Sequence, residues 1–298
     1  MTASRVVAAI ALAFAFAAGC AANEPPTMSS VLAAASDADW QPLAQEDLVY
    51  LELDTGTVVF ELAGAFAPAH IANLRMLAAS RYFDGLAIIR SQDNYVVQWG
   101  DPAAGTDAAR SHGGAAEQLA PEFFRDRDGL AISAIASDDA YADTVGFVDG
   151  MPVGADASRA WLSHCYGMLG AGRANEADSG SGAELYVVTG HAPRHLDRNV
   201  TLVGRTVYGI ERLSSLPRGT GPLGFYEDAS EHVPIRRLRF GDQLDASEQM
   251  SLQRLRTDTT TFEQLVTARR HRAEEWFADP ADRIGLCNVP IPVRRIDE

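Results

Sequence analysis

Short segments in which apolar and polar residues alternate run through the middle of the chain. Residues 48–53 and 57–62 alternate on either side of Asp54-Thr55-Gly56, and this pattern predicts a β-hairpin. Further strands are predicted at 87–90, 95–99, 168–172, 185–189, 202–207 and 235–240. Because many short strands occur with few helical segments, we expect a mainly β fold, a closed antiparallel barrel with flanking helices.

Helical spacing of apolar residues appears in two places. The first begins at Pro68, which suits a first helical turn, and continues to Ala78. The second lies between 247 and 277 and predicts one or two amphipathic helices. Its apolar positions are Leu252, Leu255, Phe262, Leu265, Val266, Ala273, Trp276 and Phe277. We expect residues 242–298 to form a helical C-terminal extension, either docked on the barrel or acting as a partner-binding module. The final NVPIPVRR holds too many prolines for a central strand.

The N-terminal segment has the features of a targeting signal. Arg5 supplies a positive charge, and the apolar run from Val6 to Ala18 is too short for a permanent membrane-spanning helix. Gly19-Cys20 resembles the lipobox of bacterial lipoproteins, whose cysteine is lipidated and becomes the mature N-terminus. The resemblance implies a signal peptide over 1–19, a lipidated Cys20, export to the periplasm and anchoring in the outer membrane. Simple cleavage near Ala22 is the alternative.

A linker follows this signal. Residues 20–46 are rich in alanine, serine, proline and acidic residues and show no sustained period, which predicts a tether with about one helical turn. We expect the folded domain to occupy residues 47–241.

Charge and cysteine content narrow the partners and the chemistry. The formal net charge of −15 disfavours nucleic acid and anionic lipid surfaces, so contact with a membrane is expected only through the lipid anchor. Cys165 and Cys287 are either bridged or two buried thiols, in a compartment where disulfides form. The sequence contains no HExxH motif and no paired CxxC motifs, so no metal and no cofactor are expected. The oligomeric state stays open.

One charged residue stands out in the strand region. Arg90 precedes an apolar strand, Tyr95 to Trp99, in which Val96 and Gln98 share a face. Because a buried guanidinium without partners is costly, the sequence predicts a shallow, half-open pocket around Arg90.

Four blocks of sequence, in order, resemble the cyclophilin-type peptidyl-prolyl isomerases. They are LELDTGTVVFELAGAFAPAHIANLRMLAASRYFDG, RSQDNYVVQWGD, GMLGAGRANEADSGSGAELYVVTG and HLDRNVTLVGRTVYGIERL. Together they cover roughly residues 48 to 240, and an ordered series is more specific than any single motif. The resemblance implies a cyclophilin-like barrel that catalyses rotation of X–Pro peptide bonds in proline-containing polypeptides.

The resemblance also implies the site residues. Arg90 would be the catalytic group, with Gln98 orienting it. Substrate would be bound by an apolar slot and by adjoining backbone, at Tyr95, Val96, Gly172, Arg173, Tyr186, His195 and Leu196. The chain departs from well-known members at Tyr95, Val96, His195 and Val200, where they have phenylalanine, methionine, tryptophan and histidine. These departures alter the shape of the slot and put binding of cyclosporin in doubt.

Relative to a compact member of that family, this chain is longer before Gly167. Residues 136–163 mix acids, glycines and aromatics without a clear period, and we expect a surface insertion that either decorates the barrel or takes part in recognition. Two further hypotheses compete with an isomerase that assists folding of envelope proteins. One is a non-catalytic proline-peptide-binding chaperone or interaction module, and the other is an envelope scaffold whose pocket is incidental.

Overall fold

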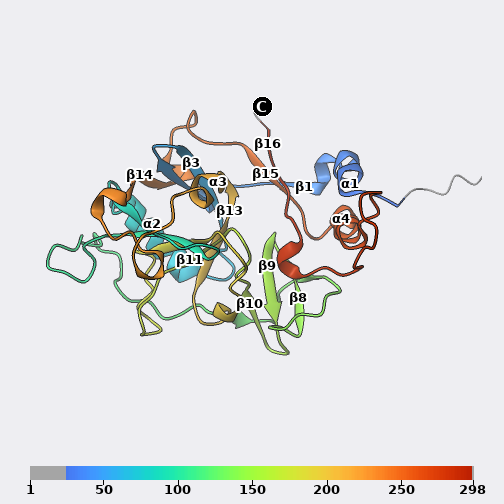
Figure 1. Ribbon diagram of the computed structural model, residues 1–298, viewed down its shortest axis with the longest axis horizontal. Helices are drawn as coiled ribbons and strands as arrows, with labels where there is room; N and C mark the ends of the chain where they lie inside the picture. The colour runs from blue at the N-terminus through green and yellow to red at the C-terminus, as the bar shows by residue number, and fades with distance from the viewer. Residues whose placement is uncertain (1–24, 297–298) are drawn as a thin grey trace, which may run out of the picture.

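The computed structural model describes residues 25–296, and its centre is a closed antiparallel barrel of eight strands (Figure 1). The strands run in the order β11-β12-β5-β4-β14-β2-β3-β13, and β13 pairs back to β11. Their bounds are β2 Leu48–Leu53, β3 Gly56–Leu62, β4 Ala87–Ser91, β5 Val96–Gly100, β11 Met168–Ala171, β12 Leu185–Val188, β13 Leu202–Tyr208 and β14 Val233–Phe240. The mainly β barrel predicted from the alternating pattern is confirmed, and each predicted strand is a strand of the barrel.

The barrel interior forms the first hydrophobic core. The rings of Phe60 and Trp99 stack within it, with centroids 5.9 Å apart. Helix α2 (Pro68–Ala79) begins at the predicted proline and adds Leu74 and Leu77 to the same core. The other α-helices are α1 Met28–Ala34, α3 Glu211–Ser214 and α4 Thr260–His271. Single-turn 3₁₀-helices are η1 Asp37–Asp39, η2 Gln45–Asp47, η3 Arg194–Leu196, η4 Pro222–Gly224, η5 Ala229–Glu231, η6 Gly241–Gln243 and η7 Leu286–Asn288.

The insertion is more ordered than its sequence pattern indicated. It contributes to a five-stranded sheet in the order β6-β10-β9-β8-β7. The bounds are β6 Arg125–Asp126, β7 Ser133–Ala134, β8 Thr144–Val148, β9 Met151–Ala155 and β10 Arg159–Leu162. Strands β8 and β9 are joined by Asp149-Gly150, both with positive φ, which is the backbone of a tight two-residue hairpin turn. Residues 136–163, which show no clear period in the sequence, thus form regular antiparallel strands.

The tether and the C-terminal extension also differ from expectation, because they fold together. Strand β1 (Trp40–Pro42) pairs with β15 (Leu252–Leu255), and β15 pairs with β16 (Val293–Arg295). Leu252 and Leu255 thus lie in a strand rather than a helix. Because they are three residues apart, they point to opposite faces of β15, and each is buried in a different hydrophobic cluster. The only α-helix that the structure describes in the extension is α4. Strand β16 begins directly after Pro292 and is an edge strand of its sheet.

Helix α1 packs against α4, and Val31 of α1 is buried (Figure 1). A second hydrophobic core joins α1 and α4 to the insertion sheet and to the outer face of the barrel, where it includes Val96 and Tyr186. In Figure 1 these added elements lie on the right, beside the barrel. The residues expected to act as a tether are therefore part of the folded body from Met28 onwards.

Some expectations fall outside the residues that the structure describes. The signal peptide over 1–19 and lipidation at Cys20 are among them. Within residues 25–296, no helix is long and apolar enough to cross a membrane.

Candidate active site

One pocket of about 290 Å³ on the outer face of the barrel collects all of the predicted site residues except His195. It is lined by Arg90, Tyr95, Val96, Gln98, Gly172, Arg173, Tyr186, Leu196 and Val200. Strands β4, β5 and β12 supply four of them, Arg90, Val96, Gln98 and Tyr186, because β5 pairs with β4 on one side and with β12 on the other. That pairing sets Gln98 opposite both Arg90 and Tyr186. Three separate sequence blocks thus meet at one place.

Arg90 is held by hydrogen bonds on three of its nitrogen atoms. Its Nη1 donates to Gln98 Oε1 at 2.8 Å, its Nε donates to the Leu223 carbonyl at 2.8 Å, and its Nη2 donates to Gln92. A β-bulge between Ile88 and Arg90 re-aims the side chain, as bulges commonly do. Burial lowers the pKa of Arg90, but a guanidinium keeps its charge in proteins. A fixed cation therefore stands at the pocket.

Two aromatic rings lie near this cation. The guanidinium carbon is 5.1 Å from the ring centroid of Phe225 and 5.6 Å from that of Tyr95. Both distances are within the range of cation–π attraction, which holds the guanidinium plane beside apolar surface. The loop that follows α3 therefore helps to hold Arg90 in place, through the Leu223 carbonyl and the Phe225 ring.

Glu184 completes a polar row that begins at Arg90. Gln98 is 8% exposed, and its Nε2 donates to Glu184 Oε1. Burial raises the pKa of Glu184, while its hydrogen bond from Gln98 and the nearby Arg90 act in the opposite direction. Gly172 makes room for this carboxylate, because a Cβ at position 172 would lie 2.8 Å from Glu184 Oε1. The row Arg90–Gln98–Glu184 fixes which way the Gln98 amide faces.

Sequence reasoning missed Gln92, Glu184, Leu223 and Phe225. A signal for Glu184 was present in the sequence. It is an isolated charge directly before the apolar run Leu185 to Val188, much as Arg90 precedes the apolar strand predicted at 95–99. Leu223 and Phe225 gave no comparable signal, because they come from a distant loop and act through a backbone carbonyl and a ring.

The structure corrects the expectation for His195, which is exposed and does not line the pocket. It lies in η3, where three residues make one turn and successive side chains point about 120° apart. Leu196 faces the pocket and Arg194 turns inward to Asp139 and Asp197, so His195 is left facing solvent. Val200, one of the departures from well-known members, does line the pocket.

The two remaining cysteines are joined. Cys165 and Cys287 form a disulfide with an S–S distance of 2.03 Å. The sequence left open a bridge or two buried thiols, and the structure contains the bridge. Among residues 25–296, no group of three or more histidine, cysteine or carboxylate side chains could hold a metal ion.

Comparisons with known proteins agree with this geometry. Residues 48–239 match the family model described as cyclophilin type peptidyl-prolyl cis-trans isomerase/CLD. Among solved structures, the chain is similar to the cyclophilin AquaCyp293 from Hirschia baltica, with a TM-score of 0.67 and 23% identity over 91% of this chain and 97% of that one, which shows a shared fold. No curated protein matches the sequence.

A cyclophilin-type isomerase from Cryptosporidium parvum, crystallised in the presence of the dipeptide Ala-Pro, is more distant. It has a TM-score of 0.44 and 15% identity over 65% of this chain and 98% of its own. The family model spans more than half of the chain, and the protein therefore belongs to the cyclophilin-type peptidyl-prolyl cis-trans isomerases.

Proposed function

We propose that this isomerase accelerates rotation of X–Pro bonds at the Arg90 pocket, and that its substrates are exposed proline-containing segments of envelope proteins. The observation that supports catalysis at this pocket is the guanidinium of Arg90, which is held beside an apolar slot and has N–H groups that are not used within the protein. Its hydrogen bonds to Gln92, Gln98 and Leu223 use three of its five N–H groups, which leaves two for a substrate among the contacts of residues 25–296.

The chemistry requires no bond to be broken. An X–Pro amide is conjugated, and the barrier to its rotation is about 18 to 20 kcal/mol. In the twisted state the proline nitrogen becomes pyramidal and regains its lone pair. A guanidinium N–H directed at that nitrogen donates a hydrogen bond that is available only in the twisted state. Such differential binding lowers the barrier.

The neighbouring residues have supporting roles in this mechanism. Val96, Tyr186 and Leu196 supply apolar surface for the proline ring. Gln98 holds Arg90 through its Oε1 atom, and Glu184 holds Gln98 through its Nε2 atom. Arg90 therefore need not reorganise when the amide twists, which is the property that makes preorganised donors effective.

Export is the second part of the proposal. Arg5, the apolar run from Val6 to Ala18 and the lipobox-like Gly19-Cys20 support secretion and anchoring in the outer membrane by a lipidated Cys20. A disulfide between Cys165 and Cys287 is of the kind that persists in an oxidising compartment. Cys20→Ser should release the full chain from the membrane fraction, and a variant that stays in that fraction would contradict the lipid anchor.

Cis/trans exchange of an Ala-Xaa-Pro-Phe peptide, measured by NMR with and without the protein, separates an enzyme from a binding module. The proposal predicts exchange far faster than the uncatalysed process, which takes tens to hundreds of seconds. Peptide resonances that shift on titration without faster exchange would instead select the non-catalytic binder. Resonances that do not shift would select the scaffold hypothesis.

A further inference from the structure

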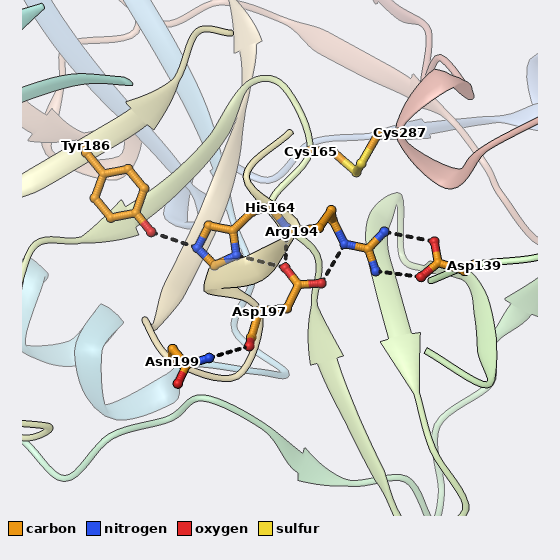
Figure 2. Close-up of polar contacts among 8 residues, drawn as sticks. All are labelled: Asp139, His164, Cys165, Tyr186, Arg194, Asp197, Asn199 and Cys287. Atoms are coloured by element: carbon orange, nitrogen blue, oxygen red, sulfur yellow. Dashed lines mark hydrogen bonds and ion pairs between the residues drawn. A yellow bond between two sulfur atoms is a disulfide. The ribbon is translucent and has the colours of Figure 1, made fainter. Parts of the chain in front are cut away.

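A row of buried polar side chains leads from the pocket wall to the insertion (Figure 2). The Tyr186 hydroxyl is 2.8 Å from His164 Nε2, and His164 Nδ1 is 2.9 Å from Asp197 Oδ1. Asp197 Oδ2 accepts from Arg194 Nε at 2.5 Å, and both Nη atoms of Arg194 reach the carboxylate of Asp139, at 3.0 and 3.1 Å. The mechanism proposed for the pocket uses none of these residues except Tyr186.

The chemistry of the groups fixes the direction of each hydrogen bond. Asp197 lies between His164 and Arg194, and these partners outweigh burial and lower its pKa, so it is an ionised carboxylate that can only accept. Nδ1 of His164 must then carry the proton that Asp197 accepts, and the backbone N–H of His164 donates to the same oxygen at 2.9 Å. Burial lowers the pKa of His164 and favours the neutral ring, so Nε2 is left as an acceptor and Tyr186 donates its hydroxyl proton to it, away from the substrate.

This row holds two walls of the pocket at once. The Tyr186 ring lies over Gly170 on the neighbouring strand, where a Cβ would come within 2.4 Å of the ring. Leu196, the apolar wall supplied by η3, stands between Arg194 and Asp197 along the chain, and both of those residues belong to the row. The orientation of Tyr186 and the position of Leu196 therefore depend on the same buried carboxylate.

The far end of the row belongs to the insertion. Asp139 precedes β8, and its side chain is 10% exposed, while that of Arg194 is 7% exposed. Removing one partner from a buried pair leaves an uncompensated charge, so the pair resists opening. Its immediate neighbour Asp138 offers a contrast, since it pairs with Arg283 where the two side chains are 95% and 81% exposed.

We propose that Asp139 is a positioning residue for the isomerase reaction, which through Arg194, Asp197 and His164 sets the orientation of Tyr186 and Leu196 and so the fit of the proline ring. The insertion then tunes substrate affinity in this chain without touching the substrate. This inference rests on the proposed function of the pocket.

The test compares Asp139→Asn with Asp138→Asn, the same substitution one residue away. The proline-peptide exchange assay gives KM and kcat, and titration of the same peptide gives its Kd. We expect Asp139→Asn to raise KM and Kd about fivefold or more with kcat within about twofold, and Asp138→Asn to match the wild type. Equal KM and Kd values for the two variants would overturn the proposal.

Tyr186→Phe keeps the ring and removes only the hydroxyl, so it tests the other end of the row. It should weaken peptide binding, and in the double variant with Asp139→Asn the two effects should not add, because both break one row. Fully additive effects would overturn the proposal. If Asp139→Asn does not fold, an unchanged Kd for Tyr186→Phe overturns it instead.

Failure of the proposed function can be distinguished from failure of this inference. If the wild type binds the peptide without accelerating exchange, the enzymatic mechanism at the pocket fails, while the Kd values of the variants still decide the role of Asp139.

Discussion

Arg90 shows how a single residue can be identified from sequence and still be understood only in the fold. Its charge ahead of an apolar strand predicted a pocket, the family resemblance implied Gln98 as its companion, and the structure joins the two residues at 2.8 Å. Besides Gln98, the guanidinium is held by Gln92 and by the Leu223 carbonyl, in a loop more than a hundred residues away. Spacing within one strand carries no information about that loop.

Glu184 should set the orientation of the Gln98 amide. As a carboxylate it only accepts from Gln98 Nε2, and this keeps Gln98 Oε1 facing Arg90. Burial raises the pKa of Glu184, so protonation begins at a higher pH than for an exposed carboxyl. A protonated carboxyl can donate to Gln98 Oε1 and allow the amide to turn. We predict that kcat/KM of the wild type falls as the pH is lowered below neutrality, and that the fall begins at a higher pH than titration of an exposed carboxyl would produce.

Glu184→Gln removes this titration. Its kcat/KM should be lower than that of the wild type at neutral pH by about threefold to tenfold, the loss expected from weakening one hydrogen bond worth about 0.5 to 1.5 kcal/mol, and it should not fall further in acid. Glu176→Gln, at an exposed carboxyl on the same connection between β11 and β12, serves as the control. A Glu184→Gln profile that keeps the acid limb of the wild type would contradict this role.

At the scale of the element, the strands of the barrel were predictable and the added elements were not. Strand β14 alternates between buried and more exposed positions, while β5, β11 and β12 are buried along their whole length but lie in the sequence blocks that carry the family resemblance. The insertion strands β8 and β9 are buried along nearly their whole length, which removes the alternation and leaves only the Asp149-Gly150 turn as a signal. Strand β1 is three residues long and depends on β15 for pairing, so no local pattern could reveal it.

His195 shows that a family resemblance does not determine which side chain of a short helix faces the pocket. Position by position, the resemblance placed it in the pocket. Which side of a one-turn helix faces a site depends on the partners of its neighbours, here the ion pairs of Arg194 with Asp139 and Asp197.

Helix α4 should be an integral part of the fold rather than a separable appendage. Phe262 is 2% exposed, and its ring meets that of Phe147 edge to face at 5.3 Å, which ties α4 to the insertion sheet. Phe262→Ala should lower the free energy of unfolding by about 3 to 5 kcal/mol. Trp276→Ala, at a side chain that is 83% exposed, should change it by about 0.5 kcal/mol or less. Urea unfolding measures both, and equal values for the two variants would mean that α4 is not part of the core.

Residues 25–296 contain two large hydrophobic cores, one inside the barrel and one between the barrel and the added elements, besides a smaller cluster around Tyr50. The pocket lies where they meet, since Val96 and Tyr186 project from barrel strands into the second core. The sequence indicated the first core through periodicity. The second draws residues from α1, the insertion and α4, which are far apart in the chain, so only the tertiary structure reveals it.

The disulfide should stabilise this second core. It joins positions 122 residues apart, and a cross-link of that span contributes about 4 to 5 kcal/mol in the chain-entropy model. The double variant Cys165→Ser and Cys287→Ser should lose much of that stability against urea. Reductant should destabilise the wild type and leave the double variant unchanged. A wild type whose unfolding does not respond to reductant would show that the bridge is not formed in solution.

The most direct test of catalysis at this pocket is the cis/trans exchange rate of a short Xaa-Pro peptide, measured by NMR with the wild type and with a variant that lacks Arg90. Arg90→Ala should slow catalysed exchange by tenfold or more, about 1.4 kcal/mol or more of barrier. Arg236→Ala, at an exposed arginine on β14 that pairs with Asp54, should leave the rate unchanged. An Arg90→Ala variant that catalyses exchange as fast as the wild type would contradict the assignment of catalysis to this pocket.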